Sequence, residues 1–155
     1  MANIYFYNMR LGKIGISEEN GNITNIFLAD SYDPSLGYIE KETEIIKKTS
    51  AQLNEYFEGK RKSFDLPLSP NGTPFEKKVW NALLEIPYGK TKSYKEIAQK
   101  IGNPKACRAV GNANGKNHIA IIIPCHRVIA SNGGLGGYSS GLEYKKALLE
   151  IEKNR

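Results

Sequence analysis

A cluster of turn-forming residues near the middle of the chain divides it into two parts with different sequence patterns. Pro67, Pro70, Asn71 and Gly72 lie close together, and such a cluster is typical of a linker between ordered segments. The chain has 155 residues, enough for one ordinary domain or two very small ones. The linker therefore favours two small domains, one over residues 1–70 and one over residues 73–155.

The first part has the pattern of β-strands followed by one helix. Apolar residues recur in three short, strand-like runs: Tyr5 and Tyr7, then Ile14 and Ile16, then Ile23, Ile26 and Leu28. Asn20-Gly21, between the last two runs, predicts a hairpin turn. From Glu42 to Gly59 the apolar residues fall near helical spacing, and Gly59 is suited to end that helix. We expect an α/β domain here.

The second part is predicted to be mainly helical. Thr73-Pro74-Phe75-Glu76 and Ser93-Tyr94-Lys95-Glu96 are capping boxes, which begin helices. Gly102-Asn103-Pro104 is expected to stop the second of these helices. A third is predicted from Lys105 to about Asn114, with a buried face formed by Ala106, Ala109, Val110 and Ala113. Two short helices joined by a tight turn are typical of a helix-turn-helix.

Charge is distributed unequally between the two parts. Residues 1–72 carry eight Lys or Arg and ten Asp or Glu, whereas residues 73–155 carry fourteen and six. A basic half of this kind is typical of a protein that meets a polyanion such as a nucleic acid. Arg108 is predicted on the outer face of its helix beside small residues, where the helix could approach a nucleic acid backbone. The alternative is an ordinary solvated arginine on a Lys-rich surface.

The two cysteines are too few for a disulfide framework, so we expect free thiols. Cys107, His118, Cys125 and His126 do not have the spacing of a structural zinc site. Cys125-His126 follows the apolar run Ile119–Ile123, which has the pattern of a buried strand. A thiol near a base is a candidate nucleophile, although a buried cysteine can also be an inert core residue. Adjacent residues do not face each other, so we expect a water to connect the two side chains.

A carboxylate on the last predicted helix is a candidate partner for His126. The segment from Gly141 to Glu152 has an apolar stripe through Leu148 and Leu149, and Glu152 falls on the same face. A carboxylate on a buried face needs a partner. The alternative is a frayed helix end that leaves Glu152 in solvent.

The run Pro124-Cys125-His126-Arg127-Val128 resembles the active-site signature of the O6-alkylguanine-DNA alkyltransferases, also called methylated-DNA–protein-cysteine methyltransferases. Further motifs of that family occur in its order and spacing: Gly72-Thr73-Pro74-Phe75, Ile86-Pro87-Tyr88-Gly89, Ser93-Tyr94, Arg108-Ala109-Val110-Gly111, Gly137-Tyr138 and Gly141-Leu142. The resemblance extends from Gly72 to Glu152, and more loosely over Leu53–Gly59.

The resemblance implies a suicide repair enzyme that takes the alkyl group of O6-alkylguanine, and also of O4-alkylthymine, irreversibly onto one cysteine. The base would first be rotated out of duplex DNA, because the stacked O6 substituent cannot be attacked in line. Family roles carry over to matching positions. Cys125 is the acceptor, His126 takes its proton through water, and Glu152 orients His126. Asn117 holds the turn that carries the nucleophile, and Tyr94 donates a proton to the guanine.

The resemblance also implies the binding surfaces. Arg108 would fill the space left in the base stack, entering from the minor groove. The small DNA-contacting residues of the same helix would be Ala106, Gly111 and Ala113.

The resemblance implies the base pocket as well. The carbonyls of Cys125 and Val128 would accept hydrogen bonds from the guanine amine, and the Ser139 amide would hold O6. Tyr138 and Ser140 would line the alkyl pocket, where Ser140 departs from the usual family residues. His118 stands where the family has proline, so we expect a surface variation there.

The family has a ribonuclease H-like N-terminal domain and a winged-helix C-terminal domain with a helix-turn-helix, and we expect both here. Some relatives carry zinc in the first domain, but residues 1–72 contain no Cys or His. We therefore expect no metal and no cofactor. The expected partner is duplex DNA containing O6-alkylguanine, bound by a monomer. No secretory signal or membrane-spanning run is visible, so we expect a cytoplasmic protein.

Three other functions share features with this sequence. A lesion-binding alkyltransferase-like protein would lack the cysteine, which argues against it. A transcription regulator responding to alkylation would need an effector domain or a further reactive cysteine. A papain-like thiol hydrolase would turn over, whereas an alkyl acceptor reacts once.

Overall fold

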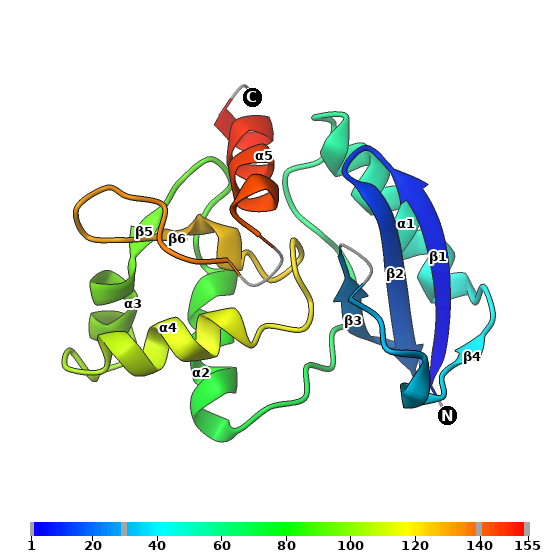
Figure 1. Ribbon diagram of the computed structural model, residues 1–155, viewed down its shortest axis with the longest axis horizontal. Coiled ribbons are helices and arrows are strands. Elements are labelled where there is room, and N and C mark those ends of the chain that lie inside the picture. Colours follow the sequence, from blue (N-terminus) through cyan, green and yellow to red (C-terminus); the bar gives the residue numbers. More distant parts are fainter. Residues whose placement is uncertain (1, 29–30, 139–140, 154–155) are drawn as a thin grey trace. The chain divides into compact units, whose positions relative to one another are not determined.

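The computed structural model describes residues 2–28, 31–138 and 141–153 (Figure 1). The chain forms two compact units, Met1–Pro70 with His118–Ile122, and Asn71–Asn117 with Ile123–Arg155. The segment His118–Ile122 therefore departs from the expected boundaries, which placed it in the second domain. It belongs to the first unit because Ile119 forms a β-bridge with Ile26, and the Ile26 N–H donates to the His118 carbonyl at 2.8 Å.

The first unit is built on a four-stranded mixed sheet. Its strands are β1 (Asn3–Met9), β2 (Gly12–Glu19), β3 (Asn22–Phe27) and β4 (Ile39–Glu40), in the order β3-β2-β1-β4. The β1–β2 and β2–β3 pairs are antiparallel, and β4 is parallel to β1. Asn20 and Gly21 have φ angles of 55° and 82°, as a tight hairpin turn requires. The predicted hairpin is confirmed.

The predicted helix is α1 (Glu44–Phe57), which packs against β1, β2 and β3 (Figure 1). The core between helix and sheet is apolar and includes Ile4, Ile14, Ile16, Ile46, Leu53, Tyr56 and Phe57. A 3-10 helix, η1 (Pro34–Leu36), precedes β4.

The predicted linker is hydrogen-bonded to the sheet. The Ile23 N–H donates to Pro67 O and the Ser69 N–H donates to Ile23 O, both at 2.8 Å.

The second unit is mainly helical. Its helices are α2 (Pro74–Leu84), α3 (Tyr94–Lys100), α4 (Cys107–Gly115) and α5 (Leu142–Lys153), with a 3-10 helix, η2 (Cys125–Arg127). Two short parallel strands, β5 (Lys92–Ser93) and β6 (Val128–Ile129), pair Lys92 with Val128. The helices α3 and α4 form the predicted helix-turn-helix (Figure 1).

Both predicted capping boxes are present. The Thr73 hydroxyl accepts from the Glu76 N–H at 3.1 Å, and Glu76 accepts from the Thr73 N–H at 2.9 Å. Ser93 and Glu96 repeat this reciprocal pair. The buried Trp80 of α2 donates its indole N–H to the Ala113 carbonyl of α4 at 2.8 Å. This bond fixes the helix-turn-helix on α2.

Two sequence expectations differ from the structure in this unit. The helix α4 begins at Cys107, two residues later than predicted, and Ala109 is exposed rather than buried. The run Ile119–Ile123 is a buried turn and not a strand. A short apolar run has the same sequence pattern in a buried turn and in a buried strand, because the pattern indicates burial rather than backbone conformation.

Within the described residues, no helix has the length and apolar content needed to cross a bilayer.

Candidate active site around Cys125

Cys125 begins η2, directly after the buried turn, and its side chain is only 4% exposed. Ile121 in this turn has φ 73°, a conformation that β-branched residues rarely adopt. The turn is held by Asn117, whose Nδ2 donates to the Ile123 carbonyl at 2.9 Å. Asn117 therefore braces the backbone that leads to the thiol.

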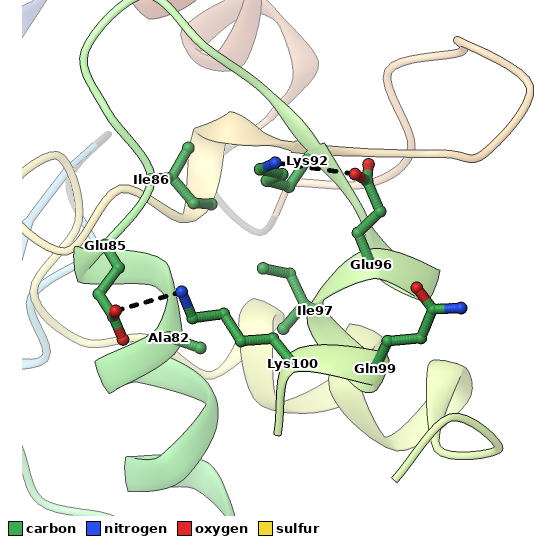
Figure 2. A pocket seen from close by; sticks show the side chains of 8 residues that line it. All are labelled: Ala82, Glu85, Ile86, Lys92, Glu96, Ile97, Gln99 and Lys100. Carbon is green, nitrogen blue, oxygen red and sulfur yellow. Dashed lines mark ion pairs between the residues drawn. The ribbon is translucent and has the colours of Figure 1, made fainter. Parts of the chain in front are cut away.

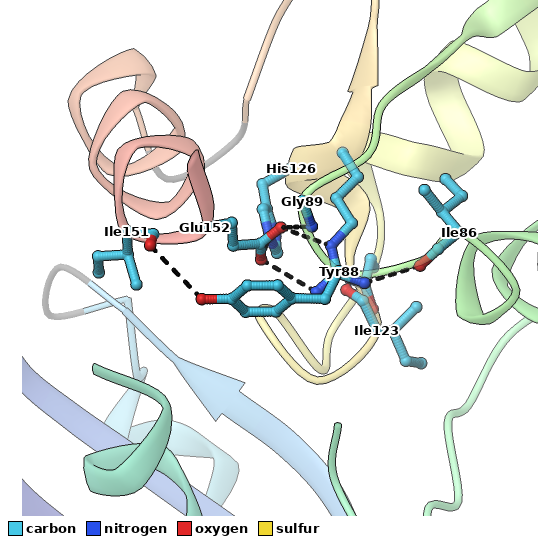
Figure 3. A network of polar contacts seen from close by, with 9 residues as sticks. Ile86, Tyr88, Gly89, Ile123, His126, Ile151 and Glu152 are labelled. Atoms are coloured by element: carbon cyan, nitrogen blue, oxygen red, sulfur yellow. Dashed lines mark hydrogen bonds and ion pairs between the residues drawn. The ribbon is translucent and has the colours of Figure 1, made fainter. Parts of the chain in front are cut away.

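His126 and Glu152 meet in the interior of the unit. His126 Nε2 lies 2.7 Å from Glu152 Oε2, and the two residues are 0% and 3% exposed. Glu152 also accepts from the Gly89 backbone N–H at 3.2 Å. Figure 3 shows these groups converging on the carboxylate. The end of α5 does not leave Glu152 in solvent, so the expected His126 partner is found.

Arg127 completes this network and was not predicted. Its Nε and Nη2 donate to Glu152 Oε1 at 2.9 Å and Oε2 at 3.0 Å, a bidentate ion pair. Its Nη1 donates to the Ile86 carbonyl at 2.8 Å, and its guanidinium lies over the Tyr88 ring. The positive charge of Arg127 favours the ionised form of Glu152, because an adjacent opposite charge stabilises a carboxylate.

The network fixes the tautomer of His126. An ionised Glu152 can only accept hydrogen bonds, so His126 Nε2 carries the proton and donates it. Burial lowers the pKa of His126 below its ordinary value, although Glu152 acts in the opposite direction. The neutral ring therefore has a lone pair on Nδ1. That atom is buried and makes no hydrogen bond to any described residue. His126 is arranged to accept a proton at Nδ1.

The Cys125 thiol is protonated in the resting protein. Burial raises the pKa of Cys125 above its ordinary value. Hydrogen bonds with Asn117 and Tyr138 and the charge of Lys145 lower it by less. The sulfur therefore needs to lose its proton during the reaction before it becomes a strong nucleophile.

Tyr94 is the first residue of α3 and is half-buried. Burial raises the pKa of Tyr94, while a hydrogen bond with the Gly137 backbone lowers it by less. Interaction with Cys125 also raises it. Tyr94 therefore keeps its hydroxyl proton at neutral pH and is available as a donor close to the thiol.

The predicted DNA-contacting residues divide into two groups. Arg108 is exposed on α4, while Ala106 at its N-terminal cap and Gly111 are half-buried. Ala113 is only 2% exposed, and its carbonyl accepts from Trp80. Its placement on the DNA-facing surface was therefore wrong. Ala113 packs against α2 because it lies one turn after the buried Val110, on the same face of α4.

The predicted pocket residues are described only in part. Val128 is fully buried in β6, and Tyr138 is half-buried and hydrogen-bonded to the Cys125 thiol. Ser139 and Ser140 lie outside the described residues. The His118 side chain is exposed, consistent with a surface variation.

Sequence reasoning missed two further buried polar residues beside the site. Lys145 is 0% exposed and Asn114 is 4% exposed. Lys145 lies on the face of α5 that carries Leu148 and Glu152, at helical spacings of three and seven residues. The argument that singled out Glu152 applies equally to Lys145. Asn114 lies four residues after Val110, so its burial was also encoded in the spacing.

One cavity of the second unit lies apart from these residues. Among the described residues, no cluster of His, Cys, Asp and Glu could hold a metal ion. A cavity of about 370 Å³ lies between α2, β5 and α3 (Figure 2). Its Lys and Glu side chains pair with each other, Lys100 with Glu85 at 3.1 Å and Lys92 with Glu96 at 3.8 Å. We assign no chemistry to this cavity.

Two protein-family models match the chain. The one for the 6-O-methylguanine DNA methyltransferase ribonuclease-like domain covers residues 4–70, and the one for the DNA binding domain of the same methyltransferase covers residues 74–154. The methylated-DNA–protein-cysteine methyltransferase of Methanosarcina acetivorans is 60% identical over 115 residues, covering 74% of this chain and 73% of that protein.

Solved structures are similar over almost the full length. A crystal structure of Mycobacterium tuberculosis O6-methylguanine methyltransferase matches with a TM-score of 0.92 and 44% identity, covering 100% of this chain and 94% of the other. A structure of Mycobacterium tuberculosis OGT in complex with DNA matches with a TM-score of 0.92 and 42% identity, covering 98% and 93%.

Proposed function

The chain belongs to the O6-methylguanine DNA methyltransferase family, and from this premise we propose that it repairs O6-alkylguanine in duplex DNA by transferring the alkyl group to Cys125. The observation that carries the assignment to Cys125 is its position. The thiol is buried beside the paired His126 and Glu152, whereas Cys107, the other cysteine, lies on α4 without such partners.

We propose that His126 Nδ1 receives the thiol proton through one water molecule. The thiolate then attacks the alkyl carbon, so that the S–C bond forms as the bond from carbon to O6 breaks. The bonding electrons move into the purine, and Tyr94 donates a proton to the guanine as its negative charge develops. Glu152 stabilises the imidazolium formed at His126, because their hydrogen bond then joins two groups of opposite charge.

Access to the alkyl carbon requires the base to leave the duplex. Arg108 is exposed on the second helix of the helix-turn-helix, so it is the residue we assign to the vacated position in the stack. Binding from the minor groove would allow this insertion to assist base extrusion. The basic second half of the chain supplies phosphate contacts that do not depend on base sequence.

Selectivity is proposed to come from backbone groups. The carbonyls of Cys125 and Val128 accept hydrogen bonds from the exocyclic amine of guanine, and Tyr138 lines the alkyl pocket. O4-alkylthymine lacks that amine and is therefore expected to react more slowly.

We further propose that one monomer carries out each transfer. We also propose that it acts in the cytoplasm, where the chromosomal DNA of prokaryotes such as Methanosarcina acetivorans lies.

The transfer is proposed to occur once per molecule, because removing the alkyl group from the thioether would require the Cys125 thiolate to leave, and a thiolate is a poor leaving group from a neutral thioether. Incubation with duplex DNA containing O6-methylguanine should add one methyl group, located at Cys125 by intact-mass and peptide mass spectrometry. The Cys107→Ser variant is the matched control and should react fully. Methylation at Cys107, or intact lesion after incubation with excess protein, would reject the proposal.

A further inference from the structure

Lys145 makes an unusual set of contacts for a lysine. Its side chain is 0% exposed, and Nζ donates to the carbonyls of Val128 at 2.7 Å, Gly137 at 3.1 Å and Leu135. An ammonium group has three N–H donors, so the contacts use all of them. Through these bonds α5 holds both β6 and the loop that leads to Tyr138.

Asn114 holds the neighbouring carbonyl in a similar way. Its side chain is 4% exposed, and Nδ2 donates to the Cys125 carbonyl at 3.3 Å. Asn114 Oδ1 is buried and makes no hydrogen bond to a described residue. Rotating the amide would place this oxygen against the Cys125 carbonyl, and two acceptors would repel. The observed orientation is therefore the one in which Asn114 serves Cys125.

These two side chains reach the same two carbonyls to which guanine recognition has been assigned. We propose that Lys145 and Asn114 are positioning residues, which orient the Val128 and Cys125 carbonyls toward the exocyclic amine of the extruded guanine. The inference rests on the proposed function. A carbonyl oxygen has two lone pairs, so a buried donor can fix its direction on one side while the amine binds on the other.

Packing alone does not account for Lys145. None of the described carboxylates forms an ion pair with it, and burial lowers its pKa below the ordinary value. Placing an ammonium group in the interior is unfavourable, and an apolar side chain of similar length would fill the same space without that penalty. The three carbonyls therefore account for a lysine at this position in a way that core packing does not, and its charge also acts on the Cys125 thiol.

Two substrates that differ only in the exocyclic amine test the proposal. Duplexes containing O6-methylguanine or O6-methylhypoxanthine are reacted under single-turnover conditions, and the ratio of the two rate constants is measured. The ratio should exceed one in the unaltered protein. It should fall by about two- to tenfold in Lys145→Met and in Asn114→Ala, the range expected for one hydrogen bond. Lys146→Met, an exposed position on the same helix, should leave the ratio unchanged.

A purely structural role would lower both rates equally and preserve the ratio, and that result would overturn the inference. A ratio of one in the unaltered protein would also overturn it, since the carbonyls would then not read the amine. Absence of any transfer to O6-methylguanine would instead reject the proposed function. If Lys145→Met does not fold, Lys145→Arg decides. It keeps the charge, but its planar guanidinium holds the N–H groups in a fixed fork and does not reproduce three bonds from a single nitrogen, so an unchanged ratio would contradict the role of Lys145.

Discussion

Gly136 lies directly against the hydroxyl group of Tyr94. A Cβ atom added to Gly136 would be 2.7 Å from the Tyr94 hydroxyl oxygen and 3.0 Å from Cε2 of its ring. Gly136 also has φ 72°, a conformation that side chains rarely adopt. The loop between β6 and α5 therefore fixes the position of the Tyr94 hydroxyl by its own backbone, and any larger residue at 136 would displace the proposed proton donor.

Replacing Gly136 by Ala should slow transfer. Loss of one positioned donor to a developing negative charge reduces rates by about 100-fold or more, so we expect a loss of that order in the single-turnover rate. Gly133→Ala is the matched control, because Gly133 has φ 89° but nothing within 4 Å of an added Cβ. Both variants should lose about 1–2 kcal/mol of stability. Equal rates in the two would contradict the Tyr94 role.

Replacing Glu152 by Gln should reduce both the transfer rate and the stability. The amide has no charge with which to stabilise the His126 imidazolium, and general base catalysis contributes about 100- to 10,000-fold. Arg127 would lose its ionised partner in a buried site, a change that costs about 3–5 kcal/mol. Single-turnover rates and urea unfolding measure the two effects.

Glu150→Gln is the control for that prediction, since Glu150 is exposed on the same helix. It should leave the rate within a factor of about two, because surface substitutions usually change free energies by less than about 0.5 kcal/mol. A Glu152→Gln protein that transfers at the unaltered rate would show that His126 does not depend on this carboxylate.

Periodicity and turn chemistry were sufficient to predict most of the fold. The hairpin at Asn20-Gly21 and the capping boxes at Thr73 and Ser93 depend on interactions within a few residues, so the local sequence specifies them. The α/β domain followed by a mainly helical DNA-binding domain is confirmed by the family models. The turn at Ile119–Ile123 was not predictable in this way. Ile121 adopts a left-handed conformation that its own side chain disfavours, so the surrounding structure imposes it.

In the candidate site, too, some residues were predictable from local sequence and others depend on the tertiary structure. Cys125 and His126 were candidates from their adjacent positions and Glu152 from its place on a buried helix face, but it was the family resemblance that assigned their roles. Arg127 was missed because its role depends on contacts with distant groups such as the Ile86 carbonyl, which leave no periodic trace in the sequence. The burial of Lys145 was encoded in the spacing of α5, but the carbonyls that it contacts, such as that of Val128, were not.

Arg108→Ala should slow repair of duplex DNA much more than repair of a single-stranded oligonucleotide. The arginine is proposed to offset the cost of unstacking the base, which is a few kcal/mol, so we expect a loss of up to about 100-fold on duplex. A single strand does not have this cost, and its rate constant at saturating substrate should change little. Equal losses on both substrates would assign Arg108 to general phosphate binding.

Two buried groups should limit the pH range in which the fold is most stable. The pKa of His126 is lowered from 6.5 by burial. As the pH falls below 6.5, the unfolded chain therefore binds a proton that the folded chain does not, and the free energy of unfolding decreases. The pKa of Cys125 is raised from 9.0 by burial. As the pH rises above 9.0, the unfolded chain releases a proton that the folded chain keeps, and the free energy again decreases.

Urea unfolding across this range measures the effect, and Cys125→Ala isolates the alkaline part. The difference in unfolding free energy between the unaltered protein and Cys125→Ala should decrease as the pH rises above 9.0, and a constant difference would contradict the burial effect. The transfer rate should behave differently on the acid side. Because His126 stays neutral below its ordinary pKa, the rate should remain on its plateau at pH 6.5.

Methylation of Cys125 should destabilise the protein. The thiol is 4% exposed and makes hydrogen bonds with Asn117 and Tyr138. A methyl group on sulfur removes the thiol proton and adds volume to a closely packed site, which costs about 1–3 kcal/mol. For a protein of this size each kcal/mol lowers Tm by about 2–4 °C, so the reacted protein should melt several degrees lower. The Cys107→Ser variant should show the same decrease in Tm after reaction, which would assign the decrease to methylation of Cys125. A Tm unaffected by complete methylation would mean that the pocket already has room for the alkyl group.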